Sequence, residues 1–424
     1  MAIAEAGPAP TQAERWSIFA TFGLGVYLYS AAVGVLPFTP MRLETYTQSG
    51  DGDLLRQLLM LGGAFVVLLG TPRSSLRLPL ILPPLVLLAI GWSAVTLVWS
   101  PVPAIGARRL VLTAVSVVVV FTYADGFGVE RLVRVMTGCL TALVFGSLLA
   151  GLIVPAAIHQ ATDLEPSLAG DWRGLFFHKN TAGLVAAVVA IIHFWRALER
   201  RRFLYVSALA ASLLLLLLSG AKTSLVALPL ALLTAAAIHF LSGRLLGRFW
   251  LFVFAIIAFL MVAVIVRAEW DAIEQFLDDP RGLTGRAAMW AALFQLGRTG
   301  AWLLGVGYAS IFAVGESTPL APYLEGWLVA AGSAHNGYLE LMLTVGVPGL
   351  VLVLLAFQIQ PLWRLLGPSA VSSTTRNIAL SILVFLAVHN VTETSLMDRG
   401  NVGFLLQIVV LSIACANGVR KQPE

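Results

Sequence analysis

Long apolar runs recur along almost the whole chain and are separated by short polar connections. A run of about 17–25 mostly apolar residues is long enough to cross a bilayer as a helix. Such runs lie at residues 16–36, 54–70, 80–99, 109–124, 132–154, 178–197, 203–219, 223–242, 248–266, 336–359, 377–393 and 401–417. The pattern predicts an all-α polytopic membrane protein with about twelve transmembrane helices, forming a single membrane domain over residues 1–424.

The longest interval without a run of membrane length covers residues 267–335 and predicts a large loop between spans nine and ten. Two parts of this loop have the spacing of amphipathic helices. In the first, apolar residues recur at Trp270, Ile273 and Leu277. The second begins at Thr284 as an N-cap, runs through Met289, Trp290, Leu293 and Phe294, and stops around residues 297–300. Arg286 is therefore expected in a first helical turn.

Composition supports the membrane interpretation. Mean hydropathy is +0.88 and only 12% of the residues are charged, against about 25% in soluble globular proteins. The net charge of +5 and the pI near 9.5 suggest nucleic acid only until the basic residues are placed along the chain. Cys139 and Cys415 lie inside apolar runs and read as small buried residues, so no disulfide framework and no cysteine-based metal site is predicted.

The distribution of charge predicts the orientation. Connections on the same side as Arg15 collect 15 of the 27 Lys and Arg but only 6 of the 22 Asp and Glu. Positive residues are enriched on the cytoplasmic side of membrane proteins. With an even number of spans, both termini are then cytoplasmic and the 267–335 loop faces outward, which is the periplasm in a Gram-negative cell. The placement explains the basic pI without nucleic acid.

Several basic residues on the predicted outward side run against this rule. Arg173 precedes the sixth span, Lys179 begins it, Lys222 lies in a short turn between spans seven and eight, and Arg286 opposes the dipole of its own helix. A group of cations at a membrane surface, together with free N–H groups at a helix start, suits a phosphate or pyrophosphate. The sequence therefore predicts an anion site on the outward side.

A histidine, His335, begins the tenth span at the same side. Further candidates for this site are His178, Asn180, Asn336, Glu340 and His389, the last with Asn390, Thr392 and Glu393 nearby. Simpler roles are compatible with the same residues, because Arg173 and Lys179 could contact lipid phosphates and His335 could cap or pack a helix end.

The order of these motifs resembles the O-antigen ligase and O-antigen polymerase superfamily. The resemblance covers roughly residues 90–415 and rests on the long outward loop after the ninth span and on four short segments. These are Arg173-Gly174 followed by His178-Lys179-Asn180, the small-residue turn 219–224, Leu283-Thr284-Gly285-Arg286 followed by Trp290, and His335-Asn336-Gly337-Tyr338-Leu339-Glu340. The sequences of two segments, His178-Lys179-Asn180 and Leu283-Thr284-Gly285-Arg286, are most similar to those of exopolysaccharide polymerases of the succinoglycan type.

The resemblance implies a GT-C-like glycosyltransferase that takes a glycan from undecaprenyl pyrophosphate on the periplasmic face of the bacterial inner membrane. A polymerase adds it to a second lipid-linked repeat unit, whereas a ligase adds it to lipid A-core. Expected partners are the lipid-linked oligosaccharide, a glycan or lipid acceptor, membrane lipid, and other polysaccharide assembly and export proteins.

The resemblance also assigns roles to four positions: Arg173, Lys222 and Arg286 as ligands of the pyrophosphate, and His335 as a catalytic residue. We add Lys179 as a further pyrophosphate ligand and assign Arg286 to catalysis as well. Fixed cations can stabilise a leaving pyrophosphate without a metal or cofactor, and His335 could remove the acceptor proton, so inversion at the anomeric carbon is expected. Lys222 departs from the ligase pattern, where Arg is typical, and Lys cannot bind phosphate through a bidentate fork.

Three further functions are compatible with the sequence. Asp51-Gly52-Asp53 with Glu44 could hold a divalent ion in a metal-dependent glycosyltransferase. A transporter or flippase for lipid-linked glycans would be expected to place ionisable residues deep within its spans, whereas here they gather at the outward side. A non-catalytic assembly protein is the third alternative. Aromatic residues of the long loop, Trp270, Trp290, Trp302, Tyr308, Tyr323 and Trp327, offer faces for acceptor sugars.

Overall fold

The computed structural model describes residues 12–39, 53–72, 82–163, 165–200, 202–242, 286–312, 318–323, 332–367 and 371–416. Within these ranges the chain is almost entirely helical and forms no β-strand; its one isolated bridge joins Ile158 and Trp172. The predicted all-α class is confirmed.

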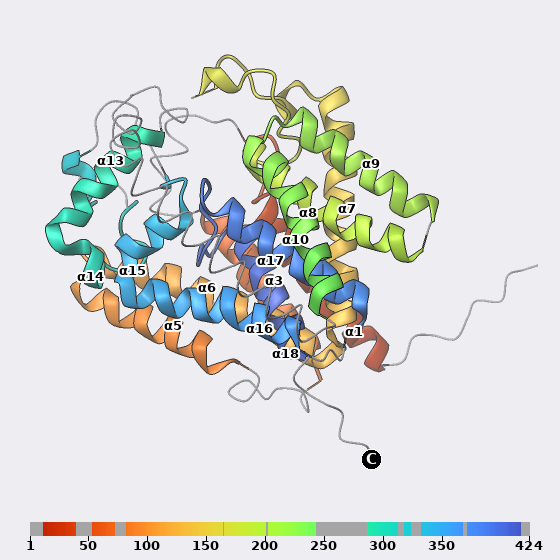
Figure 1. Ribbon diagram of the computed structural model, residues 1–424, viewed down its shortest axis with the longest axis horizontal. Coiled ribbons are helices and arrows are strands. Elements are labelled where there is room, and N and C mark those ends of the chain that lie inside the picture. Colours follow the sequence, from red (N-terminus) through yellow and green to blue (C-terminus); the bar gives the residue numbers. More distant parts are fainter. Residues whose placement is uncertain are drawn as a thin grey trace, which may run out of the picture.

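Eleven of the twelve predicted apolar runs coincide with helices, which Figure 1 shows packed into one bundle. They are α1 (Gln12–Ala32), α3 (Leu54–Gly70), α5 (Pro84–Val95), α6 (Pro103–Phe127), α7 (Val129–Ile153), α8 (Lys179–Glu199), α9 (Phe203–Leu218), α10 (Lys222–Ser242), α15 (Gly337–Leu354), α17 (Ser373–His389) and α18 (Val402–Ala416). A 3₁₀ turn, η3 (Thr96–Trp99), extends α5, and a π turn, η11 (Leu355–Ile359), joins α15 to α16 (Gln360–Leu366). The run at 248–266 lies outside the described residues.

Among the described residues, five helices are long and apolar enough to cross a membrane, and six shorter apolar helices accompany them. Many large apolar side chains stay exposed on the bundle surface, including Phe203, Leu233 and Phe240. Such a surface suits lipid rather than water. The chain is a multi-pass membrane protein, whereas the number of spans and the single-domain boundaries stay predictions.

The second predicted amphipathic helix is present as α13 (Arg286–Leu296). It continues through a π turn, η7 (Gly297–Ala301), in which Gly300 adopts a φ of 102°, into α14 (Trp302–Leu304). Met289, Leu293 and Leu296 are buried in a small second core against α15, and Figure 1 shows α13 and α14 at the edge of the bundle. The first amphipathic helix, around Trp270, lies outside the described residues.

Connections predicted to face outward meet at one end of the bundle, which we call the outward end. Arg56, in the first turn of α3, donates to the carbonyls of Ser30, Ala31 and Gly400 at 2.9, 3.1 and 2.5 Å. Glu130, at the start of α7, accepts from Thr375 at 2.8 Å at the opposite end. The alternation of ends therefore follows the predicted topology.

Helices α1 and α3 approach each other closely through glycines. A Cβ added at Gly63 would lie 2.8 Å from the carbonyl oxygen of Gly23, while one added at the adjacent Gly62 would meet no atom within 4 Å. Small residues let membrane helices approach closely and gain dispersion contacts.

We expect Gly63→Ala to destabilise the protein and Gly62→Ala to leave it unchanged or slightly more stable. Both substitutions favour the helix equally, but only the first forces α1 and α3 apart, and overpacking of this kind costs about 1–3 kcal/mol. Thermal unfolding in detergent measures the difference. Equal melting temperatures for the two variants would contradict the contact.

Candidate active site

The site is centred on Glu393, in the connection that follows α17. Its Oε1 accepts from Nη2 of Arg286 at 2.5 Å and from Nδ2 of Asn180 at 2.7 Å, and its Oε2 lies 3.4 Å from Nδ1 of His335. These three partners come from the start of α13, the first turn of α8 and the residues just before α15. We call these four residues the Glu393 cluster.

Arg286, Asn180 and His335, which the sequence predicted as site residues, thus converge on Glu393. The sequence had indicated Glu393 only as a neighbour of His389. A signal was present: Glu393 is an acidic residue at the end of an apolar run on the predicted outward side. Three basic or amide groups on that side needed a counter-charge, and the sequence did not say which carboxylate supplied it.

The carboxyl group of Glu393 is ionised. Burial by itself raises its pKa, but the hydrogen bond and charge of His335, with Arg286 and His389, outweigh burial and lower the pKa to about 2. The carboxylate is 11% exposed and the guanidinium of Arg286 18% exposed. An ion pair this enclosed depends on its added hydrogen bonds, since removing one partner strands a buried charge.

The backbone around Glu393 is shaped by Asn390. The Asn390 side chain accepts from the N–H groups of Ser395 and Leu396 at 2.9 and 3.2 Å. The N–H of Gly337 lies between the carbonyls of Asn390 and Glu393, at 2.9 and 3.0 Å. A Cβ at Gly337 would lie 2.4 Å from Oδ1 of Asn390. The glycine after His335-Asn336 is therefore required for this segment to reach the Glu393 loop.

His335 is held in place by its neighbours on both sides. Its φ is 47°, a left-handed conformation that is unusual for a residue with a side chain. Ala334 donates its N–H to Glu340 at 2.9 Å and accepts from the Trp290 indole at 2.9 Å. Asn336 caps α15 by accepting from the N–H of Leu339 at 3.0 Å.

These contacts show that Asn336 and Glu340 have a different role from His335. Glu340 and Asn336 contact backbone groups and position the histidine. The His335 side chain is 34% exposed, so it is accessible to a substrate while its Nδ1 faces Glu393. The arrangement leaves Nε2 as the ring atom available for a proton transfer.

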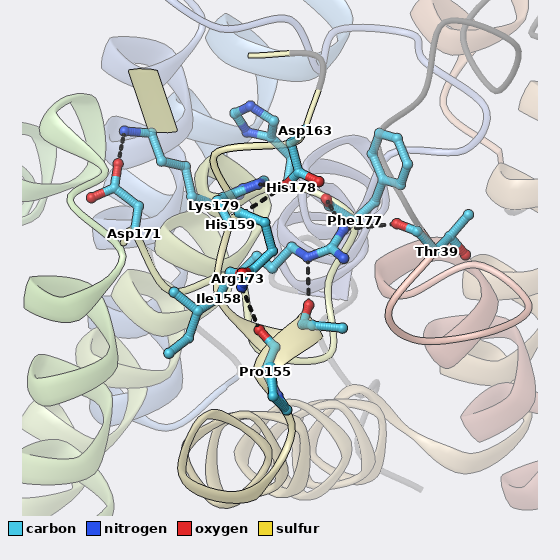
Figure 2. Close-up of polar contacts among 12 residues, drawn as sticks. Thr39, Pro155, Ile158, His159, Asp163, Asp171, Arg173, Phe177, His178 and Lys179 are labelled. Carbon is cyan, nitrogen blue, oxygen red and sulfur yellow. Dashed lines mark hydrogen bonds and ion pairs between the residues drawn. The ribbon is translucent and has the colours of Figure 1, made fainter. Parts of the chain in front are cut away.

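Arg173 is engaged with the backbone, as Figure 2 shows. Its Nε donates to the carbonyl of Ala156 at 2.9 Å and its Nη1 donates to those of Thr39 and Phe177 at 2.8 and 3.2 Å. The residue is only 3% exposed. It joins the end of α1 to the connection before α8, and its assignment as a pyrophosphate ligand stays a prediction.

The short turn before α10, which leads into Lys222, lies close to the ion pair made by Lys179. Nζ of Lys179 pairs with Asp171 at 2.6 Å, and the turn lies so close that a Cβ at Gly220 would be 2.8 Å from Asp171. The next residue after Lys222, Thr223, bonds to Thr392 beside Glu393 at 2.7 Å. Lys222 is exposed. Both lysines therefore lie on segments that contact the Glu393 region.

Two histidines cap the N-terminus of α8. Nε2 of His159 accepts from the N–H of Lys179 at 3.2 Å while its Nδ1 faces Asp163 at 3.1 Å. Nδ1 of His178 accepts from the N–H of Asn180 at 3.1 Å. Accepting from a backbone N–H requires an unprotonated ring nitrogen. Burial lowers the pKa of both imidazoles, that of His178 to about 3, so both remain neutral at pH 7.

His389 ends α17 one turn before Glu393, whose N–H it binds through its carbonyl at 2.9 Å. The ring is 3% exposed, and neither of its nitrogens has a hydrogen-bond partner within the described ranges.

No group of three His, Cys, Asp or Glu in the described part of the chain could hold a metal ion. The alternative with Asp51 and Glu44 lies outside the described residues, and Asp53 caps α3 by accepting from the N–H of Arg56 at 3.0 Å. Of the aromatic residues predicted to face sugars, Tyr308 is buried and donates to the carbonyl of Met397 at 2.6 Å. Trp270 and Trp327 lie outside the described residues.

Comparison with known families gives a match for one part of the chain. Residues 207–354 match the family model described as O-antigen ligase. The matched segment contains Lys222, Arg286, His335, Asn336 and Glu340, and its limits leave out Asn180 and Glu393. Among curated proteins, none matches the chain.

The helical bundle is that of a multi-pass membrane protein, and residues 207–354 within it are similar to O-antigen ligases. The resemblance to that superfamily, read from the motifs, is confirmed. The closer similarity to succinoglycan-type polymerases stays a prediction.

The capping histidines predict a loss of stability in mild acid. Because the pKa of His178 is lowered in the folded protein, the unfolded chain binds a proton below about pH 6.5 that the folded chain does not bind until about pH 3. The free energy of unfolding should therefore fall as the pH drops from 6.5 towards 5.

His178→Asn keeps a capping acceptor that does not titrate. We expect thermal unfolding of this variant in detergent to depend less on pH between 7.5 and 5 than that of the wild type. Parallel pH profiles for the two proteins would show that His178 does not behave as a neutral cap.

Proposed function

We propose that the protein is a metal-independent, inverting glycosyltransferase that polymerises undecaprenyl-pyrophosphate-linked repeat units on the periplasmic face of the inner membrane. The observation that carries the proposal is the convergence of Arg286, Asn180 and His335 on Glu393 at the outward end of the bundle. This cluster places Arg286, a cation that can bind the leaving pyrophosphate, next to His335, a base that Glu393 holds in position.

The donor binds through its pyrophosphate. Arg286 has five N–H donors in a planar fork, and one nitrogen is directed at Glu393, which leaves others for phosphate oxygens. Lys222 is exposed at the start of α10, and Lys179 lies in the first turn of α8. The pyrophosphate oxygens would thus meet charges from three segments, which resembles the clamps that stabilise transferring phosphates elsewhere.

The transfer step needs no redox partner. The acceptor hydroxyl oxygen attacks the anomeric carbon, and its proton moves to Nε2 of His335. The bond from the anomeric carbon to the pyrophosphate oxygen breaks, and its electron pair leaves with undecaprenyl pyrophosphate, whose charge Arg286 meets. Direct attack inverts the anomeric configuration. Glu393 acts as a positioning residue, since it touches Nδ1 of His335 and Arg286 rather than the reacting atoms.

A ligase that transfers the glycan to lipid A-core is the second candidate, because the matched family model carries that description. Lys222 favours the polymerase, since a ligase of the family typically has Arg in this turn. A transporter is less well supported: the Glu393 cluster lies at helix ends rather than in the middle of the spans.

The deciding assay supplies purified protein in detergent with a lipid-linked repeat unit as the only substrate, in the presence of a chelator. We expect a ladder of longer lipid-linked glycans with inverted linkages. Loss of a general base costs about 10²–10⁴-fold in rate, and loss of a donor to the developing anion costs about 10²–10³-fold, so His335→Ala and Arg286→Ala should each abolish the ladder.

The outcomes separate the candidates. Transfer only after lipid A-core is added would make the protein a ligase. A product that retains the anomeric configuration would contradict direct attack, and loss of activity with chelator would favour the metal-dependent alternative. If no transfer occurs with either acceptor, a transporter or a non-catalytic assembly protein would be favoured.

Glu393 gives a separate test of positioning. We expect Glu393→Gln to lower kcat about 10- to 100-fold, since a mispositioned group costs about this much, with a smaller change in KM for the donor. Glu393→Asp should recover part of the rate because it restores the charge. Gln and Asp variants that behave alike would indicate that the carboxylate charge plays no part.

A further inference from the structure

A cavity of about 910 Å³ lies at the outward end, beside the Glu393 cluster. It is lined by the segment that follows α1, the start of α3, the first half of α6, Phe177, and residues within 308–312, 332–333, 340–344 and 394–400. Pockets of about 300–1,000 Å³ enclose small organic ligands. Lys179, Lys222 and Arg286 do not themselves line this cavity, although Phe177, two residues before Lys179, does.

The walls carry both signs of charge in balance. Three arginines and three carboxylates line the cavity, namely Arg56, Arg109, Arg399, Asp53, Glu340 and Asp398. Because groups of both signs line the cavity, its walls are not built for an ion of one sign. They offer many donors and acceptors at fixed positions, which suits a ligand that is uncharged and rich in hydroxyl groups.

Two of these charged side chains are available to a ligand. Asp398 and Arg399 form a long ion pair at 3.9 Å, and Asp398 also accepts from the N–H of Gly400 at 3.3 Å, but their side chains stay 39% and 25% exposed. Arg56 and Arg109, in contrast, already donate to backbone carbonyls. The pair at 398 and 399 therefore offers an acceptor and a fork of donors at the mouth of the cavity.

Aromatic and apolar side chains complete the walls. Phe177 and Phe312 line the cavity with Leu341 and Met397. Sugar rings present apolar C–H faces between their hydroxyl groups, and a wall that alternates aromatic surface with polar groups matches them better than a wall of one kind. A purely isoprenoid chain would leave six ionisable side chains facing hydrocarbon, which is costly.

The cavity is lined by sequence neighbours of the catalytic residues, although no residue of the Glu393 cluster lines it. Ser333 and Thr394 line it, and they lie two residues before His335 and one residue after Glu393. Glu340, which also lines it, binds the N–H of Ala334 at 2.9 Å. A ligand in the cavity would therefore lie close to His335, the proposed base.

We propose that this cavity binds the acceptor glycan and directs one of its hydroxyl groups towards His335. The proposal rests on the proposed function, because it gives the acceptor of that reaction a place. The same chemistry, a neutral sugar chain ending in a reactive hydroxyl, is presented by a lipid-linked repeat unit and by lipid A-core. Acceptor choice would then depend on the walls at residues 54–57 and 394–400.

Gln57 provides the test. It lines the cavity from α3, is half-buried and makes no side-chain hydrogen bond within the described residues. Gln57→Trp fills the space, while Leu58→Trp places the same ring on the exposed face of the same helix, outside the lining. The probe is the lipid-free oligosaccharide repeat unit, and binding is followed by saturation-transfer NMR on each detergent-solubilised protein.

We expect the wild type and Leu58→Trp to bind the oligosaccharide alike and Gln57→Trp to bind it at least tenfold more weakly. In transfer assays with each acceptor, Gln57→Trp should raise KM for the acceptor at least tenfold, with donor affinity unchanged. Arg399→Gln should weaken acceptor binding several-fold without filling the cavity, which covers the case of a misfolded Gln57→Trp protein.

The contrary outcomes are equally definite. Equal oligosaccharide binding by all variants, or none by the wild type, would overturn the proposal. Displacement of the sugar by undecaprenyl phosphate, which carries the isoprenoid chain without sugar, would assign the cavity to lipid. Because the NMR measurement needs no catalysis, it decides the cavity even if no transfer is found and the proposed function fails.

Discussion

A single buried carboxylate organises the outward end of this protein. Glu393 accepts hydrogen bonds from Arg286 and Asn180 and faces His335, so three segments far apart in the chain depend on one charge. In surroundings of low polarity such a carboxylate is tolerated only because its partners surround it. The need to surround Glu393 also places the Arg286 guanidinium and the His335 imidazole within reach of one substrate. The contacts that stabilise the fold here are therefore the same ones that position the reactive groups.

Much of the fold follows from apolar patterning alone. Eleven of the predicted runs became helices, and the alternation of their ends matched the predicted topology. Length and hydrophobicity dictate such helices because backbone groups in a bilayer must bind within their own segment. Helix α13 was also predicted correctly, since Thr284 and the spacing from Met289 to Phe294 gave a local signal. The region around Trp270 lies outside the described residues.

The site was predictable by residue type but not by pairing. Arg286 was named because basic residues are rare on that side of a membrane protein, and His335 and Asn180 were named with their short motifs. An acidic residue on that side, such as Glu393, is expected and gave a weaker signal. Arg173 shows the limit of that reasoning: an out-of-place arginine was read as a phosphate ligand, and its guanidinium is bonded to backbone carbonyls. Sequence shows that a charge needs a partner, but the partner comes from tertiary packing.

The connection after α17 has a consequence for how substrate preference can change. Within residues 390–400 it bonds to α10 through Thr392, holds the base through Glu393, and lines the cavity with Asp398 and Arg399. A substitution there disturbs several tasks together. The opposing wall, at the start of α3, touches the cavity without touching His335. Divergence in which sugars are joined is therefore easiest on α3, and the segment from 390 to 400 is expected to drift slowly among relatives with different products.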